Sequence, residues 1–531
     1  SATRVDASQL IEKGRENLLL QSNAFNNWIN SNTTETSGQS GYDGSSDAWL
    51  LDKSAASAFI YRTFLGSGVY SFSLYAKAGT LNSVFILILA SGGNGNAYFN
   101  MSTGVVDAFG NNAFDAQIED VGGGWYRCSL IGSYTSISQV RIYPANDEAL
   151  ADTSGNILIQ SAQAELGLVA TPYIETGATT VKAGLLENTP RLDYSGGATC
   201  PSLLLEPSRT NLFTQSEYFG GSSWTKVGST TTTNNYTTSP SGQNNATRLQ
   251  WTNATNYIYQ PVSHIGSNHT LSIYLKSNTG VSQNVRLFMD NGAKGKEVVV
   301  TTQWQRFEFT NTTAVTQSIR NAGLIKTSSQ VGDLDISIFA AQFEPNATYP
   351  TSYIPTYGTS QTRAEDECVG AGDASTFNST EGVLYAEIAA LADDGTNRYI
   401  TLNSGSKNDS VRIYYNSLLQ NQISIQVRSA DAVQALYNHT ISDVRDFIKV
   451  ALSYKLNEFK MYVNGSLVHT DTSGLTPIGL SELDFDSAGQ DPFYGKAKEV
   501  IYFPKALSDL QLAILTGATT YETFDEMALA L

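Results

Sequence analysis

An internal repeat constrains this fold more than any other feature of the sequence. RENLLLQSNAF begins at Arg15, and RTNLFTQSEYF begins at Arg209. The phrases that follow keep their order: YSFSLYAKAG, GGGWYRCSL and LIQSAQAELGLVATPYIETG in the first copy match HTLSIYLKSNTG, TTQWQRFEF and SIFAAQFEPNATYPTSYIPTYG in the second. Order and spacing kept over roughly 160 residues indicate a duplicated domain rather than a solenoid of short repeats.

Alternating residues in both copies predict β-strands. In YSFSLYA, Tyr70, Phe72 and Leu74 fall on one face, whereas Ser71 and Ser73 fall on the other. A period of two is typical of a half-buried strand. Turn clusters such as SGGNGN separate the runs. Short alternating strands between polar turns predict a β-sandwich for each copy.

Composition agrees with an all-β chain and excludes several classes of function. A chain of 531 residues is expected to hold about three domains. Its net charge of −17 repels phosphate backbones, so no nucleic-acid partner is expected. The sequence has no long apolar run or basic amphipathic helix, so no membrane insertion is expected. Three widely spaced cysteines form neither a disulfide framework nor a metal knuckle.

The pattern changes after the second copy. IKVALSYKLNEFKMYVNGSLVHT contains two hairpins, with Asn464 and Gly465 as a two-residue turn. Ser508 is expected to cap a short helix whose apolar side carries Leu510, Ile514 and Leu515. A third domain of a different type is therefore predicted.

The motifs of the repeat and those of the third domain each resemble a known type of domain. R-x-N-L-x-x-Q-S, S-x-Y-x-K, W-x-R and A-Q-x-E…T-x-Y-I together resemble the carbohydrate-binding-module-like jelly rolls that occur in tandem along bacteriophage tail fibres and related virion fibres. The third domain, with FYGKAKEVIYF and its terminal helix, is similar to concanavalin A-like, laminin G-type sandwiches. The expected fold class is all-β, with two tandem jelly-roll β-sandwiches followed by a concanavalin A-like (laminin G-type) β-sandwich.

The expected domain boundaries follow the repeats. They are a leading strand or linker at 1–14, a first jelly roll at 15–180, a linker at 181–208, a second jelly roll at 209–362, and the laminin G-like domain at 363–531. The apolar segments GLLEN and SLLLEP in the second linker are expected to pair with a neighbouring domain or chain.

The resemblance implies a phage virion fibre protein of the tail-fibre type. Such a protein would bind a host cell-surface polysaccharide or glycoconjugate through many weak sites, without catalysis and without a cofactor. Other virion proteins would be its partners, a homotrimer its assembly, and the virion surface its location after synthesis in the host bacterial cytoplasm. Two alternatives stay open: a structural head or tail decoration with spacer sandwiches, and a polysaccharide depolymerase.

The depolymerase alternative depends on SELDFDS. In one strand Glu482, Asp484 and Asp486 would share a face, with successive positions about 6.8 Å apart. Concanavalin A-like glycoside hydrolases use a similar acidic row, whose last position is Glu rather than Asp. A solvated acidic strand is the plainer interpretation, and we expect no catalytic residue.

Aromatic and basic residues on the outward strand faces are the expected glycan platform. Sugars offer apolar C–H faces that stack on rings, and hydroxyls that bind planar polar groups. The platform residues are Tyr75, Lys77, Trp125 and Arg127 in the first copy, and Tyr274, Lys276, Trp304 and Arg306 in the second. The same alternation also occurs on ordinary solvated sheets, and the aromatic residues Tyr42, Tyr236 and Tyr257, expected in loops, are equally available.

Two further groups of residues bear on metal binding. Asp43 and Asp47 in GYDGSSD are the candidate ligands of a structural calcium ion, which binds loop carboxylates and carbonyls. The four histidines show no metal-ligand spacing, and His264 and His269, which bracket a turn, are expected to face solvent.

Overall fold

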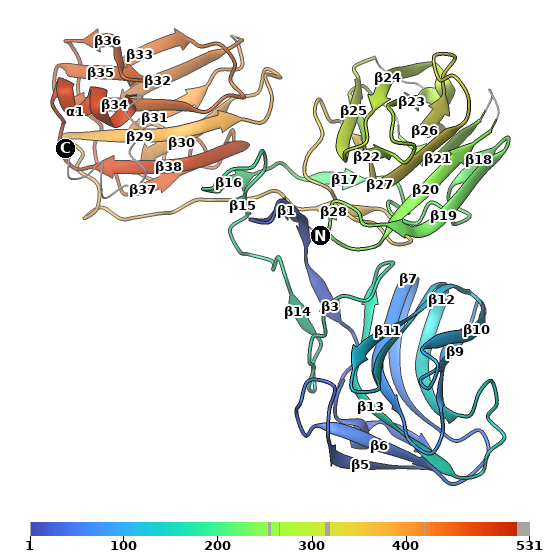
Figure 1. The fold of residues 1–531 in the computed structure, drawn as a ribbon. Helices are drawn as coiled ribbons and strands as arrows, with labels where there is room; N and C mark the ends of the chain where they lie inside the picture. Colours follow the sequence, from blue (N-terminus) through green and yellow to red (C-terminus); the bar gives the residue numbers. More distant parts are fainter. Residues whose placement is uncertain (1, 253–255, 265, 314–318, 419, 518–531) are drawn as a thin grey trace.

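The computed structural model describes residues 2–252, 256–264, 266–313, 319–418 and 420–517. Figure 1 shows three β-sandwiches that meet at a junction of short strands near the N-terminus. The fold-class prediction is confirmed: the chain is all-β, with two jelly-roll sandwiches followed by a laminin G-like sandwich. Among the described residues the single α-helix is α1 (Asp509–Thr516), and two 3₁₀ turns are η1 (Phe25–Asn27) and η2 (Asp290–Gly292).

The first sandwich is built from antiparallel strands joined in one continuous ladder, in the order β10-β9-β8-β12-β7-β13-β6-β5, with β11 on β12 and β4 on β7. Its strands are β4 (Ile29–Ser31), β5 (Thr33–Gln39), β6 (Ala48–Lys53), β7 (Phe59–Ala78), β8 (Ser83–Ala90), β9 (Gly95–Asn100), β10 (Val105–Asn111), β11 (Ala113–Gly122), β12 (Trp125–Ala145) and β13 (Gly155–Leu166).

Two long strands belong to both layers of this sandwich. The first part of β7 and the last part of β12 pair with each other and with β4 and β8, whereas their other halves pair with β13 and β11. We call the layer of β4, β8, β9 and β10, together with the first part of β7 and the last part of β12, the outer sheet. The two layers enclose a core that includes Ile60, Phe72, Ile86 and Ile142.

In the second sandwich the same two layers are separate five-stranded sheets, ordered β18-β21-β26-β23-β24 and β19-β20-β27-β22-β25. Its strands are β18 (Thr225–Val227), β19 (Thr230–Thr237), β20 (Ala246–Trp251), β21 (Tyr257–Ser263), β22 (His269–Ser277), β23 (Gln283–Met289), β24 (Lys294–Val300), β25 (Gln305–Asn311), β26 (Ile319–Lys326) and β27 (Leu334–Pro345). Thus β21 and β22 match the two halves of β7.

The third sandwich packs a seven-stranded sheet, β15-β16-β38-β29-β34-β35-β36, on a five-stranded sheet, β33-β32-β31-β30-β37. Its strands are β15 (Leu192–Asp193), β16 (Ser202–Leu205), β29 (Glu381–Ala390), β30 (Arg398–Asn403), β31 (Ser410–Tyr415), β32 (Gln422–Ser429), β33 (Ala432–Thr440), β34 (Ile448–Lys455), β35 (Glu458–Val463), β36 (Ser466–Asp471), β37 (Glu482–Asp484) and β38 (Gly495–Phe503). Because β16 pairs with β38, the SLLLEP segment does pair with a neighbouring domain.

The repeated phrases form the same buried latch in both jelly rolls. The opening strands β3 (Arg15–Asn17) and β17 (Arg209–Asn211) pair with β14 (Val181–Ala183) and β28 (Gln361–Arg363). The Asn17 amide donates to two carbonyls and its oxygen accepts from two backbone amides, at 2.8–3.2 Å. Asn211 makes the same four bonds at 2.9–3.1 Å. The latch ties the opening strand to the last long strand and to the closing phrase.

The A-Q-x-E…T-x-Y-I phrase completes the latch. The Gln163 side-chain oxygen accepts from the Ile174 amide at 2.7 Å, as Gln342 does from Ile354 at 2.6 Å. Glu165 and Glu344 accept hydrogen bonds from the amide and hydroxyl of the threonine that opens T-x-Y-I. The A-Q-x-E…T-x-Y-I residues therefore hold the fold together and are not exposed for binding.

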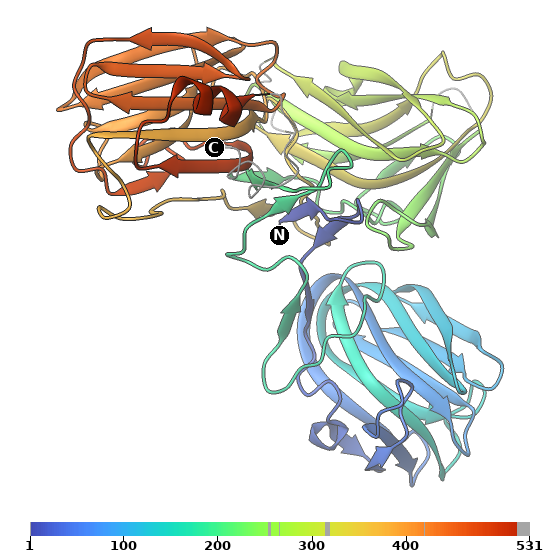
Figure 2. The ribbon, with the colours of Figure 1, turned by 60° about the vertical axis from the view of Figure 1, so that its left-hand side comes forward.

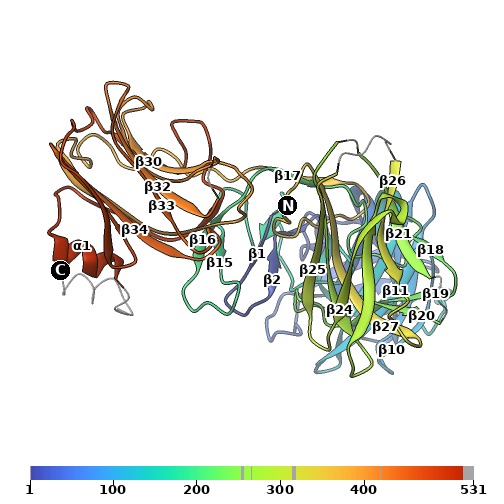
Figure 3. The same ribbon diagram turned by 90° about the horizontal axis from the view of Figure 1, so that it is seen from above.

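A buried ionic cluster joins the sandwiches at the junction. Glu206 accepts hydrogen bonds from Arg191 at 2.7 Å and from the amide of Ser352 at 2.7 Å, and it pairs with Arg363 at 2.8 Å. Arg191 also pairs with Asp366. Figures 2 and 3 show that the strands β1 (Thr3–Val5), β2 (Ile11–Lys13), β15 and β16 gather at this junction. The linker is thus folded between domains.

The first and second sandwiches also touch directly. The Val69 amide donates to the Tyr357 carbonyl at 2.9 Å. Gly68 lies beside it at φ 129°, where a Cβ would come within 2.0 Å of that carbonyl oxygen. The rings of Phe114 and Tyr218 stack at 4.1 Å. These contacts fix the orientation of one jelly roll against the other.

Candidate functional site

The structure brings the predicted platform residues of the first sandwich together but covers them. Arg127 lies opposite Tyr75, and Trp125 opposite Lys77, on paired strands. The Tyr42 ring, however, stacks on the Tyr75 ring at 3.6 Å. Tyr75 is 9% exposed and Trp125 is 3% exposed. The expectation of an open ring platform is therefore wrong here, because the loop before β6 closes over the sheet.

The basic residues of that platform bind backbone carbonyls. Arg127 donates to the carbonyls of Ala170 and Thr171 in the closing phrase, and Lys77 donates to Gly123 at 2.7 Å. Both cations are thereby used to hold loops in place.

In the second sandwich the N-terminal segment lies beside the predicted platform. Tyr274 and Trp304 pack near Ile11 of β2 and remain partly exposed. The Trp304 indole donates to the Thr238 carbonyl at 3.0 Å, and its ring lies 5.5 Å from the Lys276 ammonium. A glycan role for these residues stays a prediction.

Arg306 completes this second group. It lies opposite Tyr274 on the paired strand, with its guanidinium carbon 5.7 Å from the Tyr274 ring. It donates to the Ser272 hydroxyl at 2.9 Å.

The acidic row is split by the end of its strand. β37 ends at Asp484, so Asp486 lies beyond it, and the expectation of one strand carrying all three acids is wrong. Asp484 is 4% exposed and accepts hydrogen bonds from the Gly370 amide and the Asn403 side chain, both at 2.6 Å. Burial, and then the nearby carboxylates, raise the pKa of Glu482. Asp484 is thus committed to holding the loop before β29.

The candidate calcium ligands converge on hydrogen-bond donors. The Ser45 hydroxyl lies within hydrogen-bond distance of both carboxylates, 2.6 Å from Asp43 and also close to Asp47, and its one proton is donated to either acid. The Gln160 side-chain amide donates to the same two carboxylates. These donors lie between the two acids in the described structure, and a calcium role for Asp43 and Asp47 stays a prediction. Within the described ranges, no cluster of three or more His, Cys, Asp or Glu side chains could hold a metal ion.

The two neighbouring histidines lie partly inside the protein. Their rings are perpendicular, with centroids 4.5 Å apart. His269 is 3% exposed, so the expectation that it faces solvent is wrong. Neither of its ring nitrogens has a hydrogen-bond partner, and burial lowers the pKa of both His264 and His269.

A row of aromatic rings crosses the outward face of the outer sheet. Tyr143 of β12 lies opposite Phe85 of β8, which lies opposite Tyr98 of β9. Phe59 of β7 lies on the other side of Tyr143. Ring centroids are 4.9 Å apart for Phe59 and Tyr143, 5.4 Å for Tyr143 and Phe85, and 4.2 Å for Phe85 and Tyr98. We call these residues, with Tyr61 of β7, the aromatic strip.

The strip lies outside the core because strand neighbours alternate. Ile60, Ile86 and Ile142 point inward and are fully buried, so the residues beside them point outward. Phe59, Tyr61 and Tyr98 are partly exposed. Phe85 and Tyr143, in the middle of the row, are 9% and 5% exposed, so a ligand lying across the strands would meet the outer rings Phe59, Tyr61 and Tyr98.

Polar groups accompany the strip in the next row of the sheet. Arg141 of β12 lies opposite Tyr61 on one side and Leu87 on the other, and Leu87 lies opposite Asn96. The Arg141 guanidinium carbon is 4.5 Å from the Phe59 ring centroid. Rings that bind apolar faces thus stand beside groups that bind hydroxyls.

The second sandwich repeats part of the strip. Tyr257, Ile258 and Tyr259 of β21 occupy the place of Phe59, Ile60 and Tyr61 in β7. The Tyr257 and Tyr259 rings are 5.7 Å apart. Tyr257 lies on a strand, so the expectation of a loop is wrong there.

Sequence reasoning missed the strip, although a signal was present. VFILILA in β8 is apolar on both faces, whereas a strand with one solvated face alternates apolar with polar residues. Phe85 and Leu87 are the outward half of that run. An aromatic outward face in a half-buried strand is the pattern that would have indicated the strip.

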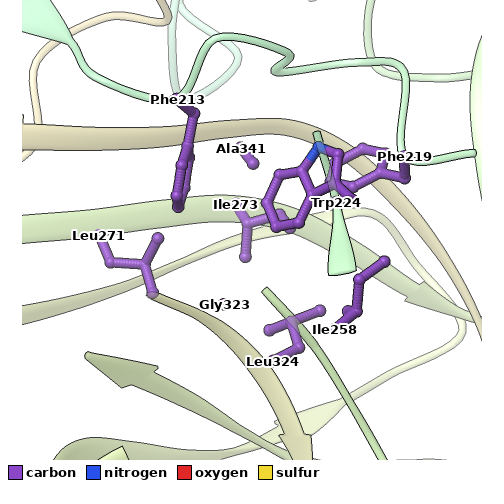
Figure 4. Close-up of a pocket in the computed structure, with 9 residues that line it drawn as sticks. All are labelled: Phe213, Phe219, Trp224, Ile258, Leu271, Ile273, Gly323, Leu324 and Ala341. Carbon is purple, nitrogen blue, oxygen red and sulfur yellow. The ribbon is translucent and has the colours of Figure 1, made fainter. Parts of the chain in front are cut away.

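Two hollows lie elsewhere in the described part of the chain. Figure 4 shows the first, a void inside the second sandwich among residues such as Phe213, Trp224 and Ile273. Its volume of 10 Å³ has room for about one water molecule at most. The second is an open groove of 390 Å³ lined by Val281, Gln330 and Asp333 among others, without any aromatic ring. The aromatic strip is therefore the stronger candidate site.

Within the described ranges, no helix has the length and apolar character needed to cross a membrane.

No family model matches the sequence, and no curated protein matches it. Solved structures match parts of it. The CBM40 domain of Ruminococcus gnavus IT-sialidase, bound to alpha2,3 sialyllactose, is 17% identical, covers 29% of this chain and 95% of its own, and has a TM-score of 0.25. The CBM22-1–CBM22-2 tandem domain of Paenibacillus barcinonensis Xyn10C is 14% identical, covers 60% and 93%, and has a TM-score of 0.21.

Domains LG4-5 of the mouse laminin alpha1 chain are 9% identical, cover 46% of this chain and 88% of their own, and have a TM-score of 0.19. The chain is thus similar to carbohydrate-binding-module and laminin G-like β-sandwiches. With identities and scores this low, the sandwich assignment rests on the strand order described above.

Proposed function

We propose that this chain is a non-catalytic glycan-binding segment of a bacteriophage virion fibre, and that the aromatic strip receives a host-surface saccharide. The observation that carries the proposal is the row of rings from Phe59 through Tyr143 and Phe85 to Tyr98, which lies on the sheet face away from the main core. Phe59, Tyr61 and Tyr98 remain partly exposed there, and rings gathered on one face are a candidate interaction surface.

The chemistry of the strip favours a saccharide as its ligand. Tyrosine rings combine an apolar face with a hydroxyl at the edge, which suits the C–H faces and hydroxyls of a sugar. Arg141 and Asn96 add hydrogen-bonding groups in the adjacent row. The strip is a sheet face rather than a deep pocket, so each site is expected to bind weakly.

Repetition compensates for weak sites. The Tyr257 and Tyr259 pair supplies a second, smaller ring surface, and the Glu206 cluster keeps the sandwiches in fixed positions. Several weak sites held on one body can raise avidity by 10²–10⁴. A homotrimer on the virion surface, made in the bacterial cytoplasm, would multiply the sites again.

The same rigid junction also suits a spacer in a head or tail decoration, so the test must separate the two roles. Purified chain in excess should prevent virions that carry it from adsorbing to host cells, because it occupies the same receptors. Adsorption that continues at saturating chain would contradict the adhesin proposal and favour the spacer. Gold-labelled antibody against the third sandwich would place the chain on intact particles.

A further inference from the structure

Building on the glycan-binding role proposed above, we infer that the aromatic strip selects an acidic saccharide, of the uronic-acid type, with Arg141 as the group that receives its carboxylate. Arg141 sits in the middle of the sheet, between Tyr61 of β7 and Leu87 of β8. It is the basic residue of the row Tyr61–Arg141–Leu87–Asn96, which runs beside the rings of the strip.

The guanidinium has no acidic partner. Among the residues that the structure describes, no carboxylate lies within ion-pair distance of Arg141. Its Nη1 donates to the Tyr143 hydroxyl at 3.3 Å, and its plane lies near the Phe59 ring. Glu148, which acts on the pKa of Tyr98, follows β12 in a loop. A fixed cation among rings is thus left for a ligand.

A uronic acid would pair with this cation. Its carboxylate would accept hydrogen bonds from the guanidinium in the two-point geometry that arginine favours. Its C–H face would stack on Phe59 or Tyr61. A neutral sugar would use the rings alone and leave the Arg141 guanidinium without a carboxylate partner. Since the chain carries a net charge of −17, the preference for an acid would come from this local cation and not from the overall field.

The test compares polyuronates of different linkage, such as polygalacturonate and polymannuronate, with the carboxyl-reduced neutral form of each, by isothermal titration of the full chain. Wild type should bind at least one polyuronate about tenfold more tightly than its reduced form, since each 1.4 kcal/mol is tenfold. Arg141→Gln should weaken binding of the polyuronate far more than binding of its reduced form and so remove that preference. Arg62→Gln is the matched control, because Arg62 is on β7 and donates to the Asn27 carbonyl.

The possible outcomes distinguish the preference for an acidic saccharide from the proposed glycan-binding function. Equal affinity of wild type for acidic and neutral forms would overturn the acidic preference and leave glycan binding standing. Binding of neither form would overturn the proposed function itself. An unchanged melting temperature of Arg141→Gln shows that the variant is folded; if Arg141→Gln unfolds, Arg141→Lys, which keeps the charge but loses the two-point geometry, should weaken the preference.

Discussion

The ring of Phe85 lies 4.2 Å from the ring of Tyr98 on the neighbouring strand, on the side of the sheet that faces away from the core. Aromatic pairs contribute about 0.5–1.5 kcal/mol beyond the area that they bury. Here the tilted pair extends a row that includes Tyr143 and Phe59. The buried rings Phe85 and Tyr143 thus support the partly exposed rings Tyr98 and Phe59 at the two ends of the row.

The latch is expected to matter for stability and not for binding. Asn211→Ala removes four buried hydrogen bonds and should lower the free energy of unfolding of the second sandwich by about 2–4 kcal/mol. Urea unfolding followed by circular dichroism measures the loss. Gln303→Ala, at an exposed position between β24 and β25 of the same sandwich, is the control and should change it by less than about 0.5 kcal/mol. Equal stability of both variants would contradict the latch.

The junction should weaken in acid. Burial alone would raise the pKa of Glu206, but the guanidinium groups of Arg363 and Arg191, with hydrogen bonds from Ser352, outweigh burial and lower the pKa to about 2. A lowered carboxyl pKa stabilises the folded state above the usual value of 4.5, and this stabilisation is lost as pH falls toward 2.

The Glu206→Gln variant tests this junction. It should cost about 3–5 kcal/mol at pH 7, because it leaves the buried Arg363 without its carboxylate partner and Arg191 with Asp366 alone, and should lose part of the acid dependence. Glu187→Gln, at the exposed end of the same linker, is the control. An unfolding free energy equal to wild type at pH 7 would show that the cluster does not hold the domains together.

The histidine pair should make the second sandwich acid-sensitive at milder pH. Burial lowers the pKa of His269 below 6.5, and His264 and Arg320 lower it further. The unfolded state therefore binds protons first, so stability present above pH 6.5 falls as pH decreases through that value. Unfolding free energies at pH 7.5 and 5.5 should differ less in His269→Gln than in wild type. The same difference in both would refute the assignment, and His469→Gln serves as the control.

The acidic row is expected to be inactive. Asp484 is held by the Gly370 amide and the Asn403 side chain, so it is committed to structure. Incubation of the protein with host polysaccharide should release no reducing ends, and Glu482→Gln should bind the polysaccharide as wild type does. Release of reducing ends that Glu482→Gln abolishes would establish a depolymerase instead.

Much of the architecture could be predicted because it is encoded locally. Period-two alternation indicated the strands, and Asn464 with Gly465 indicated a turn that the structure shows between β35 and β36, with both residues at positive φ. Ser508 caps α1 as predicted. The buried side of that helix carries Leu512 and Leu515, whereas Leu510 is 70% exposed, because the contact with the sheet rather than the helix period decides which side is covered.

The site could not be predicted in the same way. Strand alternation places the side chains of Tyr75 and Phe85 on the sheet face away from the core, but it does not show which residues cover them. Tyr75 is covered by Tyr42, and Tyr274 is flanked by Ile11, which comes from a segment far away in the chain. Such long-range contacts leave no local pattern.

The central claim is that the aromatic strip binds the host glycan, and one titration tests it most directly. Tyr61 and Tyr98 are partly exposed, so Tyr61→Ala with Tyr98→Ala should keep the fold, which the melting temperature checks. Isothermal titration with purified host polysaccharide should show affinity about 10- to 100-fold weaker than wild type, whereas Tyr236→Ala, an exposed ring outside the strip, should bind as wild type. A folded double variant that binds as tightly as wild type would contradict the claim.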